Sequence, residues 1–323
     1  MNRENFIDKL IEKVKTKKSH IVIGLDPNYD KIPFHLKTMN VKKYGEGLTG
    51  IARTIFDFNR SIIDAVFDLV PAIKPQIAFY EQYGIEGLKA FKQTVQYGKK
   101  RGLIVIEDAK RNDIGTTASA YSSGHIGEVT NSKNRSFRVF DLDAITVNPY
   151  LGSDGIMPFI RDAKLYEKGV FVLVKTSNPS STEFQNLTVT SSDGRTLKLY
   201  ELIAEYVRKW GEDNIGFAGY SAVGAVVGAT FPEEAKVLRK LMPKAYFLVP
   251  GYGVQGGKVN DVLGCFNKDG YGALISASRS IIYAYQNQEQ KSSLDFIETS
   301  RNAVIKMNDE INQGLKNLSI LPW

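Results

Sequence analysis

Short apolar segments rich in β-branched residues alternate along this chain with longer segments whose apolar residues recur at intervals of three and four. The short segments predict β-strands and the longer ones predict amphipathic helices. The expected strands are His20–Leu25, Ala72–Ala78, Leu103–Asp108, Ala144–Asn148, Gly169–Lys175, Val223–Gly228, Ala245–Val249 and Gly272–Ser276. The expected helices are Leu48–Val70, Tyr80–Lys100, Thr116–Glu128, Asp154–Ala163, Leu197–Trp210 and Pro232–Leu241. Most of the strands are unbroken apolar runs, which indicates a parallel sheet buried on both faces.

This alternation predicts the fold class. Eight strand-and-helix units in one chain favour an α/β fold, a single-domain (β/α)₈ TIM barrel that spans residues 1–323. A doubly wound open sheet is the structural alternative, but no strand is followed by G-x-G-x-x-G at the start of a helix. Two polar, turn-rich stretches, Pro27–Gly47 and Ser177–Thr196, do not fit the repeat. We expect them to be insertions that cover a functional site, contact another subunit or serve no function.

Charge narrows the class of partner. The formal net charge of +7 suits an anionic partner, but the lysines are spread along the chain and no run of five basic residues marks a nucleic-acid-binding arm. A small phosphorylated substrate is therefore favoured over nucleic acid. The three histidines are not at metal-ligand spacing and there is one cysteine, so we expect no metal site.

The same composition bears on where the protein works. The single cysteine, Cys265, excludes an intrachain disulfide and fits a reducing cytoplasm. The N-terminal segment has the pattern of a charged amphipathic helix and not that of a signal peptide. The longest mostly apolar run, Ala222–Phe231, has about half the length of a membrane span. We therefore expect a cytoplasmic protein without a membrane contact.

Polar residues gather at one end of the expected strands. The residues that close or follow the apolar runs include Asp26, Lys74, Asp108, Lys110, Asn148, Lys175, Ser177, Ser278 and Arg279. The strand starts carry no comparable set. Buried charges are costly unless they pair with each other or with a ligand. Because the C-terminal ends of barrel strands form the catalytic face, this asymmetry predicts an active site there.

The motif Asp108-x-Lys110-x-x-Asp113 is the main candidate for chemistry. Asp108 and Lys110 are two residues apart and project to the same side of an extended strand end, while Asp113 follows in the next loop. A lysine between two carboxylates keeps its proton, which favours a proton donor over a Schiff-base nucleophile. The spacing alone is also typical of a structural salt-bridge network or a solvated loop. Lys74 and Asp26, at the ends of two other strands, shift the interpretation toward catalysis.

A candidate phosphate site follows the last two strands. The seventh strand runs into the glycine-rich segment Pro250–Gly257, whose backbone N–H groups can approach an anion, and the eighth precedes Arg279, whose planar fork suits a phosphate. Loops at these positions are the usual phosphate site of a TIM barrel. The alternative is a glycine-rich turn beside a surface arginine. We expect His125 on a helix face or at a subunit contact, and Cys265 as a packed side chain.

Seven segments at the strand ends carry a family resemblance. They are GLDPN (Gly24–Asn28), AIKPQIAFYEQYG (Ala72–Gly84), IEDAKRNDIGTT (Ile106–Thr117), TVNPYLG (Thr146–Gly152), VLVKTSNP (Val172–Pro179), VPGYGVQGG (Val249–Gly257) and ASRSI (Ala277–Ile281). In this order they resemble the orotidine 5′-phosphate decarboxylase family. The long loops make the chain similar to the subgroup found in many bacteria and in malaria parasites. The segments span nearly the whole chain, which makes the resemblance far more specific than a lone D-x-K-x-x-D.

The resemblance implies a cofactor-free decarboxylation of orotidine 5′-phosphate to UMP, the last step of de novo pyrimidine biosynthesis. Lys110 would protonate C6 of the pyrimidine, Asp108 would lie against the substrate carboxylate, and Lys74 and Asp113 would complete the array. The family places the second aspartate in the neighbouring subunit's site, which implies a homodimer with shared active sites. The implied substrate-binding residues are Asp26 and Lys74 at the ribose, Ile114 and Thr117 across the subunit contact, Ser177 at the pyrimidine, and Pro250, Gln255 and Arg279 on the phosphate side.

One position departs from some relatives, because Gln76 stands where they carry Asn, and no ribose contact is assigned to it. Three other functions stay open at the level of the sequence. They are a magnesium-dependent sugar-phosphate aldolase or decarboxylase with the same motif, a class I aldolase that forms an imine through Lys110 or Lys74, and an inactive barrel that only binds a nucleotide or a protein. An intact charged array speaks against the last, since such a cluster costs stability when idle.

Overall fold

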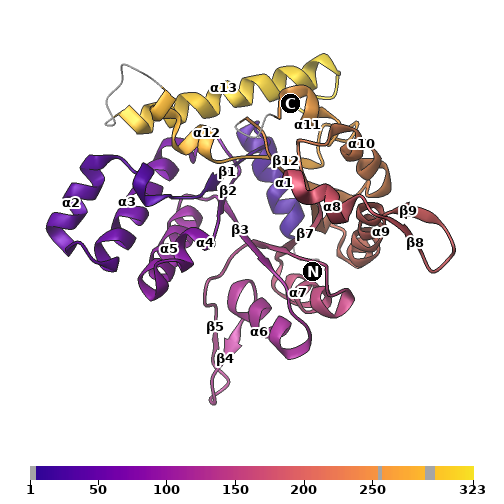
Figure 1. Ribbon diagram of the computed structural model, residues 1–323, viewed down its shortest axis with the longest axis horizontal. Helices are drawn as coiled ribbons and strands as arrows, with labels where there is room; N and C mark the ends of the chain where they lie inside the picture. Colours follow the sequence, from indigo (N-terminus) through magenta and orange to yellow (C-terminus); the bar gives the residue numbers. More distant parts are fainter. Residues whose placement is uncertain (1–4, 254–256, 288–294) are drawn as a thin grey trace.

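The computed structural model describes residues 5–253, 257–287 and 295–323 and shows eight parallel strands closed into a barrel (Figure 1). Around the barrel the strands follow the order β1-β12-β11-β10-β7-β6-β3-β2. Their bounds are β1 (Ile21–Leu25), β2 (Ala72–Pro75), β3 (Ile104–Arg111), β6 (Ala144–Val147), β7 (Gly169–Lys175), β10 (Ser221–Val227), β11 (Ala245–Pro250) and β12 (Ala273–Ala277). The TIM-barrel prediction is confirmed, and closure of the sheet excludes the open doubly wound alternative.

Helices connect the strands and lie outside the barrel (Figure 1). The longer ones are α1 (Phe6–Lys17), α2 (Phe34–Tyr44), α3 (Leu48–Val66), α5 (Gly84–Lys100), α6 (Gly115–His125), α7 (Ser153–Tyr166), α9 (Leu199–Gly211), α10 (Pro232–Leu241) and α13 (Phe296–Asn317). The short ones are α4 (Ala78–Glu81), α8 (Thr182–Gln185), α11 (Val259–Leu263) and α12 (Arg279–Ile282), with 3₁₀ turns at η1 (Tyr29–Lys31), η2 (Pro179–Ser181), η3 (Glu212–Asn214) and η4 (Ala284–Asn287). Within the described ranges, no helix combines the length and the apolar character needed to cross a membrane.

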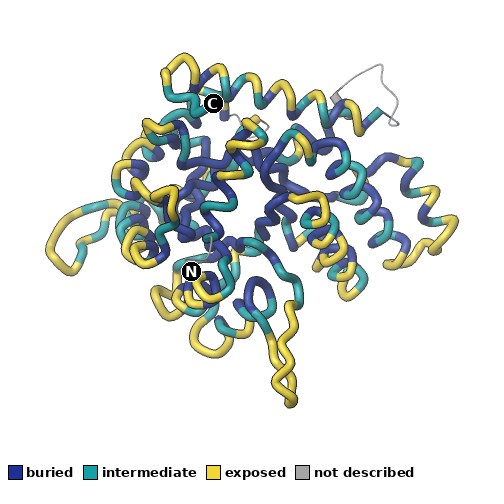
Figure 2. Tube along the Cα trace, turned by 180° about the vertical axis from the view of Figure 1, so that it is seen from behind, coloured by how far each residue is buried: buried dark blue, intermediate teal, exposed yellow. Residues whose placement is uncertain are grey.

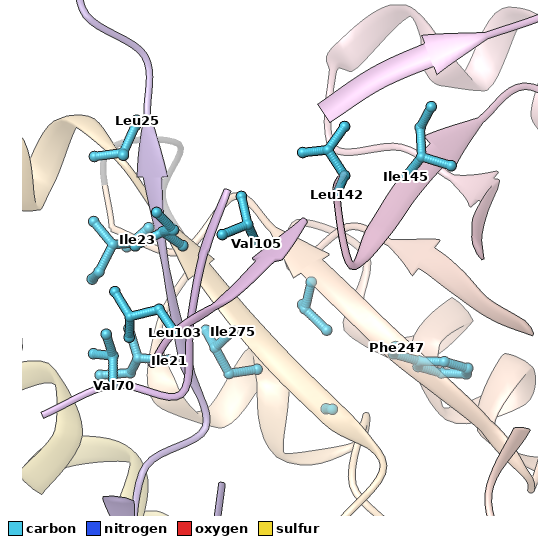
Figure 3. Close-up of a cluster of buried hydrophobic side chains, with 14 of the residues drawn as sticks. Ile21, Ile23, Leu25, Val70, Leu103, Val105, Leu142, Ile145, Phe247 and Ile275 are labelled. Carbon is cyan, nitrogen blue, oxygen red and sulfur yellow. The ribbon is translucent and has the colours of Figure 1, made fainter. Parts of the chain in front are cut away.

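Both faces of the barrel strands are buried, and each face packs against a different layer. One set of side chains, including Ile23, Val105 and Ile275, belongs to the cluster between the strands and the surrounding helices (Figure 3). The other set, including Ile106 and Leu248, fills the barrel interior. A strand between these two layers can be apolar at every position, which explains the unbroken runs in the sequence. Figure 2 shows the same division, with buried residues at the centre and exposed ones on the outer helices and hairpins.

Helix α1 closes the N-terminal end of the barrel. Phe6 and Leu10 are buried among the interior side chains, and the ring of Phe6 packs edge-on against Phe171 with 6.3 Å between centroids. Gly169 starts β7 directly under this ring, because a Cβ at Gly169 would lie 2.3 Å from it. The Asp8 carboxylate fixes the helix from the other side by accepting the backbone N–H groups of residues 217 and 218 at 3.0 and 2.8 Å. The cavity described below therefore forms at the opposite, C-terminal end of the strands.

Several elements differ from the expected pattern. Strand β2 ends at Pro75, and the helix expected after it divides at Gly84, where φ is +59°. The stretch 27–47 contains α2, and the stretch 177–196 contains α8 and most of the hairpin formed by β8 (Thr188–Thr190) and β9 (Thr196–Lys198). A second unexpected hairpin pairs β4 (Val129–Thr130) with β5 (Ser136–Phe137). These elements are largely exposed, so they lack the apolar periodicity by which buried elements are found in a sequence.

Candidate active site

A cavity of about 650 Å³ opens at the C-terminal ends of the barrel strands. Interior-facing strand residues and the loops after β7, β11 and β12 line it. Among the residues expected from the sequence, those that line the cavity are Asp26, Lys74, Asp108, Lys110, Ser177, Pro250 and Arg279. These residues come from separate strand ends that the closed parallel barrel brings together, as expected for the catalytic face of this fold.

Lys74, Asp108 and Lys110 form a continuous chain of charges on the cavity wall. The Asp108 carboxylate accepts from Lys74 Nζ through Oδ2 at 2.7 Å and from Lys110 Nζ through Oδ1 at 2.5 Å. The side chain of Lys74 is buried, whereas that of Lys110 is 44% exposed. All three line the cavity, and Lys110 is the most exposed of them.

The charges of this cluster support one another. Burial alone would raise the pKa of the Asp108 carboxyl, but the neighbouring charges of Lys74 and Lys110 outweigh burial and lower that pKa below its ordinary value. Burial alone would also lower the pKa of Lys74, but the carboxylates of Asp108 and Asp26 outweigh it and raise that pKa. Asp108 and Lys74 are therefore both charged at neutral pH, and the aspartate presents a fixed negative charge beside Lys110.

The pairing of β2 with β3 places these residues together. Ile73 stands opposite Val105 in the ladder, and an isolated bridge joins Gln76 to Asp108, so the two strand ends run side by side. Lys74 and Asp108 both belong to the set of alternating positions that faces the barrel interior. Beyond Asp108 the regular ladder with β6 is interrupted, and the backbone of Lys110 adopts φ +50° in the left-handed region.

Asp26 follows β1 and lines the cavity with a carboxylate oxygen that is not satisfied. Its Oδ1 is buried and has no hydrogen-bond partner among the described residues. The backbone carbonyl of Asp26 accepts from the Tyr283 hydroxyl at 3.0 Å, which anchors the turn after β1. A buried polar atom without a partner is costly. This oxygen is therefore a candidate to accept a hydrogen bond from a ligand hydroxyl.

The loops after β11 and β12 carry the residues from which the sequence predicts an anion site. Gly251 and Gly253 have φ of +103° and +80°, conformations that other residues rarely adopt. Arg279 is exposed at the start of α12, and no described residue pairs with its guanidinium. Gln255, which the sequence also assigns to the phosphate, lies outside the described residues. A guanidinium left free beside a glycine-rich loop suits a phosphate group.

Asp113, Ile114 and Thr117 do not line the cavity of their own chain. They lie at the turn from β3 into α6, where Asp113 Oδ1 accepts the backbone N–H of Ile114 at 2.8 Å. The side chain of Ile114 is 52% exposed, and Thr117 is also exposed. Their assignment to a neighbouring subunit's site stays a prediction, because the structure contains one chain.

Two of the polar residues at the expected strand ends lie outside the cavity. Lys175 is buried outside the barrel, where Nζ donates to Asn186 Oδ1 at 2.7 Å and lies 4.0 Å from the ring centroid of Phe231. Asn148 does not line the cavity either, and its Oδ1 accepts the backbone N–H of Tyr150 at 3.0 Å.

His125 lies on the inner face of α6, as the sequence predicted for a helix-face residue. Its Nδ1 is 2.6 Å from Glu107 Oε2, and both side chains are buried on the helix side of β3.

Thr146 is a cavity residue that sequence reasoning missed. It lies within β6, lines the cavity and donates a hydrogen bond to Asp108. The available signal was that Thr146 is the only hydroxyl in the otherwise apolar run AITV, at a position that faces inward. Among the described residues, no group of three or more His, Cys, Asp or Glu side chains is arranged to hold a metal ion.

Comparison with known proteins places this chain in a family. The profile of the orotidine 5′-phosphate decarboxylase / HUMPS family matches residues 20–293. The chain belongs to this family. Two relatives named orotidine 5′-phosphate decarboxylase, from Caldicellulosiruptor saccharolyticus and Caldicellulosiruptor bescii, are 43% and 44% identical over 312 residues, which cover 96% of this chain and 99% of each relative. The solved structure of Leishmania donovani OMP decarboxylase matches with a TM-score of 0.71 at 29% identity, over 96% of this chain and 98% of that one.

Membership of the orotidine 5′-phosphate decarboxylase / HUMPS family confirms the resemblance seen in the strand-end segments. The matched range begins at His20, immediately before β1, and contains every barrel strand. It excludes α1, which fills the N-terminal end, and α13, which packs against α3. The family profile therefore coincides with the part of the fold that builds the cavity.

Proposed function

We propose that this protein catalyses the decarboxylation of orotidine 5′-phosphate to UMP. The observation that carries the proposal is the Lys74–Asp108–Lys110 chain of charges in the C-terminal cavity of a member of this family. Loss of CO₂ from C6 leaves an electron pair on a ring carbon. Fixed positive charge aimed at that carbon stabilises it without an electron-sink cofactor. The accessible ammonium group of Lys110 supplies such a charge together with a proton.

In the proposed reaction the bond between C6 and the carboxylate breaks, and its electron pair stays on C6. Lys110 Nζ then gives a proton to C6, which yields the neutral pyrimidine ring of UMP. Asp108 lies beside the substrate carboxylate and holds Lys110 in position through the 2.5 Å contact. Because both carboxylates are negative, departure of CO₂ relieves the repulsion between them. The reaction balances without a cofactor or a metal ion.

The remaining cavity residues are proposed to bind the rest of the nucleotide. The unsatisfied oxygen of Asp26, together with Lys74, supports binding of the ribose hydroxyls. Ser177, on the loop after β7, faces the pyrimidine, and Arg279 takes the phosphate with Gln255 and the loop that begins at Pro250. The phosphate is far from C6, so its binding energy can position the reacting ring without taking part in the bond changes.

We further propose that two chains share their active sites. Asp113, Ile114 and Thr117 are exposed or half-buried on the outside of their own cavity, so they are free to enter a neighbour's. In such a homodimer each site holds Lys74, Asp108 and Lys110 from one subunit and Asp113 from the other. A second carboxylate next to Lys110 would complete the alternating array of charges.

The proposal is tested by incubating the purified full-length chain with orotidine 5′-phosphate in the presence of EDTA. We expect the ultraviolet absorbance of the substrate to fall while UMP accumulates on a chromatogram. Orotidine without its phosphate serves as the matched substrate control, and we expect it to react far more slowly. A folded protein that leaves orotidine 5′-phosphate intact contradicts the proposal. Activity that EDTA abolishes and Mg²⁺ restores points instead to metal-dependent sugar-phosphate chemistry.

A further inference from the structure

The hydroxyl of Thr146 makes three hydrogen bonds to the strand that carries the charged array. Thr146 Oγ1 accepts the backbone N–H groups of Ala109 and Lys110, each at 3.0 Å, and donates to Asp108 Oδ1 at 3.1 Å. A hydroxyl has one hydrogen to donate and two lone pairs to accept with, so these three contacts use its whole capacity. Thr146 is 1% exposed, and its position in the middle of β6 fixes where the hydroxyl lies.

These contacts occur where the backbone of β3 departs from a regular strand. The ladder between β3 and β6 pairs Glu107 with Ile145 and then shifts register before Arg111 pairs with Val147. Within the shifted segment, Lys110 has φ +50°, which costs a non-glycine residue roughly 1–2 kcal/mol. Two backbone donors in this segment bond to a side-chain oxygen of β6. The Thr146 hydroxyl therefore holds together the turn that aims Lys110 into the cavity.

The same hydroxyl also orients the carboxylate. Asp108 Oδ1 accepts both from Thr146 Oγ1 and from Lys110 Nζ, while Oδ2 accepts from Lys74. Because both carboxylate oxygens of Asp108 accept hydrogen bonds, rotation of the carboxylate about its bond to Cβ is restricted. One side chain thus contacts the backbone of Lys110 and the side chain of its partner Asp108.

We propose that Thr146 is a positioning residue for the decarboxylation, acting through Lys110 and Asp108. This inference rests on the proposed function, because its main readout is the rate of that reaction. Misplacement of a reacting group by a fraction of an ångström to an ångström lowers rates by roughly 10- to 100-fold. Asp26, Lys74, Ser177 and Arg279, the described residues proposed to bind the nucleotide, are not hydrogen-bond partners of Thr146.

The test compares Thr146→Val, Thr146→Ser and a control, Thr54→Val. Valine keeps the shape of threonine but removes the hydroxyl, whereas serine keeps the hydroxyl. Thr54 is an equally buried threonine of α3, and its hydroxyl bonds only to the backbone of Gly50 at 2.8 Å among the described residues. We expect Thr146→Val to lower kcat about 10- to 100-fold with KM changed less than about threefold. We expect Thr146→Ser and Thr54→Val to stay within about threefold of the unsubstituted protein.

Each outcome of this experiment is informative. A Thr146→Val protein with normal kcat, or one in which KM rises and kcat is kept, contradicts the inference. Equal losses in Thr146→Val and Thr146→Ser also contradict it, because the hydroxyl would then not be the cause. If Thr146→Val does not fold, a Thr146→Ser protein with kcat lowered more than tenfold overturns the inference and one with near-normal kcat supports it. If the unsubstituted protein does not consume orotidine 5′-phosphate, the proposed function itself is refuted. That outcome differs from all those above, in which the unsubstituted protein is active.

Discussion

At the N-terminal end of the barrel, charged side chains are paired with one another, whereas at the C-terminal end some polar groups have no partner within the part of the chain that the structure describes. Lys99 and Lys168 near the strand starts both donate to Asp141, at 2.6 and 3.0 Å. At the strand ends, a buried oxygen of Asp26 and the guanidinium of Arg279 make no hydrogen bond to a described residue. The same eight strands run between the two ends, so the difference comes from the side chains and connecting segments placed at each end.

Side chains at the N-terminal end stabilise the barrel, whereas those at the C-terminal end are available to a ligand. The N-terminal end is filled by apolar side chains of α1, and its charges neutralise one another at short range. The C-terminal end has an open cavity, and the buried oxygen of Asp26 without a partner among the described residues costs stability in the absence of a ligand. Substitutions at the C-terminal end are therefore expected to change mainly the reaction rate, and substitutions at the N-terminal end mainly the free energy of unfolding.

The largest expected effect is on the reaction rate of a Lys110→Ala variant. Removing the proton donor should lower the decarboxylation rate by about 10²- to 10⁴-fold. The free energy of unfolding should change by less than about 1 kcal/mol, because Lys110 is 44% exposed and Asp108 keeps its pair with Lys74. A matched control is Lys9→Ala at the opposite end, since Lys9 is 38% exposed and pairs with Glu167 at 2.7 Å. We expect Lys9→Ala to retain the full rate, as measured by substrate absorbance.

Mixing two inactive variants sharpens this prediction, because it tests which subunit supplies each residue. A Lys110→Ala chain mixed with an Asp113→Ala chain should regain activity, since a hybrid dimer contains one site with both residues intact. Random exchange of subunits would restore up to about a quarter of the unsubstituted rate. If both variants are inactive alone and the hybrid forms but stays inactive, Asp113 acts in its own chain; an active Asp113→Ala chain would mean that Asp113 is not needed. A Lys110→Ala protein with a near-normal rate would remove Lys110 from its role as proton donor.

A substitution at the N-terminal end should lower the free energy of unfolding and leave the reaction rate unchanged. Phe6 is 2% exposed and packs against Phe171 and Gly169, so Phe6→Ala leaves a cavity under α1. We expect the free energy of unfolding in urea to fall by about 3–5 kcal/mol, with the rate per folded molecule unchanged. Phe217→Ala is the control, because Phe217 is near the same end and 70% exposed, and its effect should be within about 0.5 kcal/mol. A loss of rate in folded Phe6→Ala would show that the two ends are coupled.

The residues at the strand ends that line the cavity could be predicted from the sequence better than a cavity residue inside a strand. Asp26, Lys74, Asp108 and Lys110 stand at the ends of apolar runs, and parallel strands must bring such positions to one edge. Thr146 could not be found in the same way, because a threonine inside a strand is ordinarily explained by its β-branched shape. Its role depends on a register shift in β3 that the sequence does not reveal.

Lys175 shows why counting along a strand can fail. It is two residues after Leu173, which lines the cavity, so a regular strand would point both side chains the same way. The ladder between β7 and β10 shifts register in this interval, and Lys175 turns outward to Asn186. A bulge of this kind reverses the alternation at the point where it occurs. The exposed hairpins and α2 were missed for another reason, because few of their residues are buried and no apolar period marks them.

The smallest expected effect concerns His20, at the N-terminal end of β1. This side chain is fully buried, and its ring stacks on Trp323 with 5.0 Å between centroids. Burial lowers the pKa of His20 to about 3, outweighing its contact with the backbone of Ala273. Between pH 6.5 and 3 the unfolded chain therefore binds a proton at this position that the folded chain does not. Stability rises with pH across that interval, and it falls as pH is lowered through it.

The contribution of His20 can be isolated with a His20→Phe variant, which keeps an aromatic ring against Trp323 but cannot titrate. Lowering the pH from 7.5 to 5.0 should cost the unsubstituted protein about 2 kcal/mol more unfolding free energy than it costs the variant. The larger ring of Phe can change the free energy of unfolding by an amount that does not depend on pH. This amount cancels, because urea titrations compare each protein with itself at the two pH values. Equal losses in the two proteins would mean that His20 titrates alike when folded and unfolded. Burial of His20 at the N-terminal end would then contribute nothing to the dependence of stability on pH.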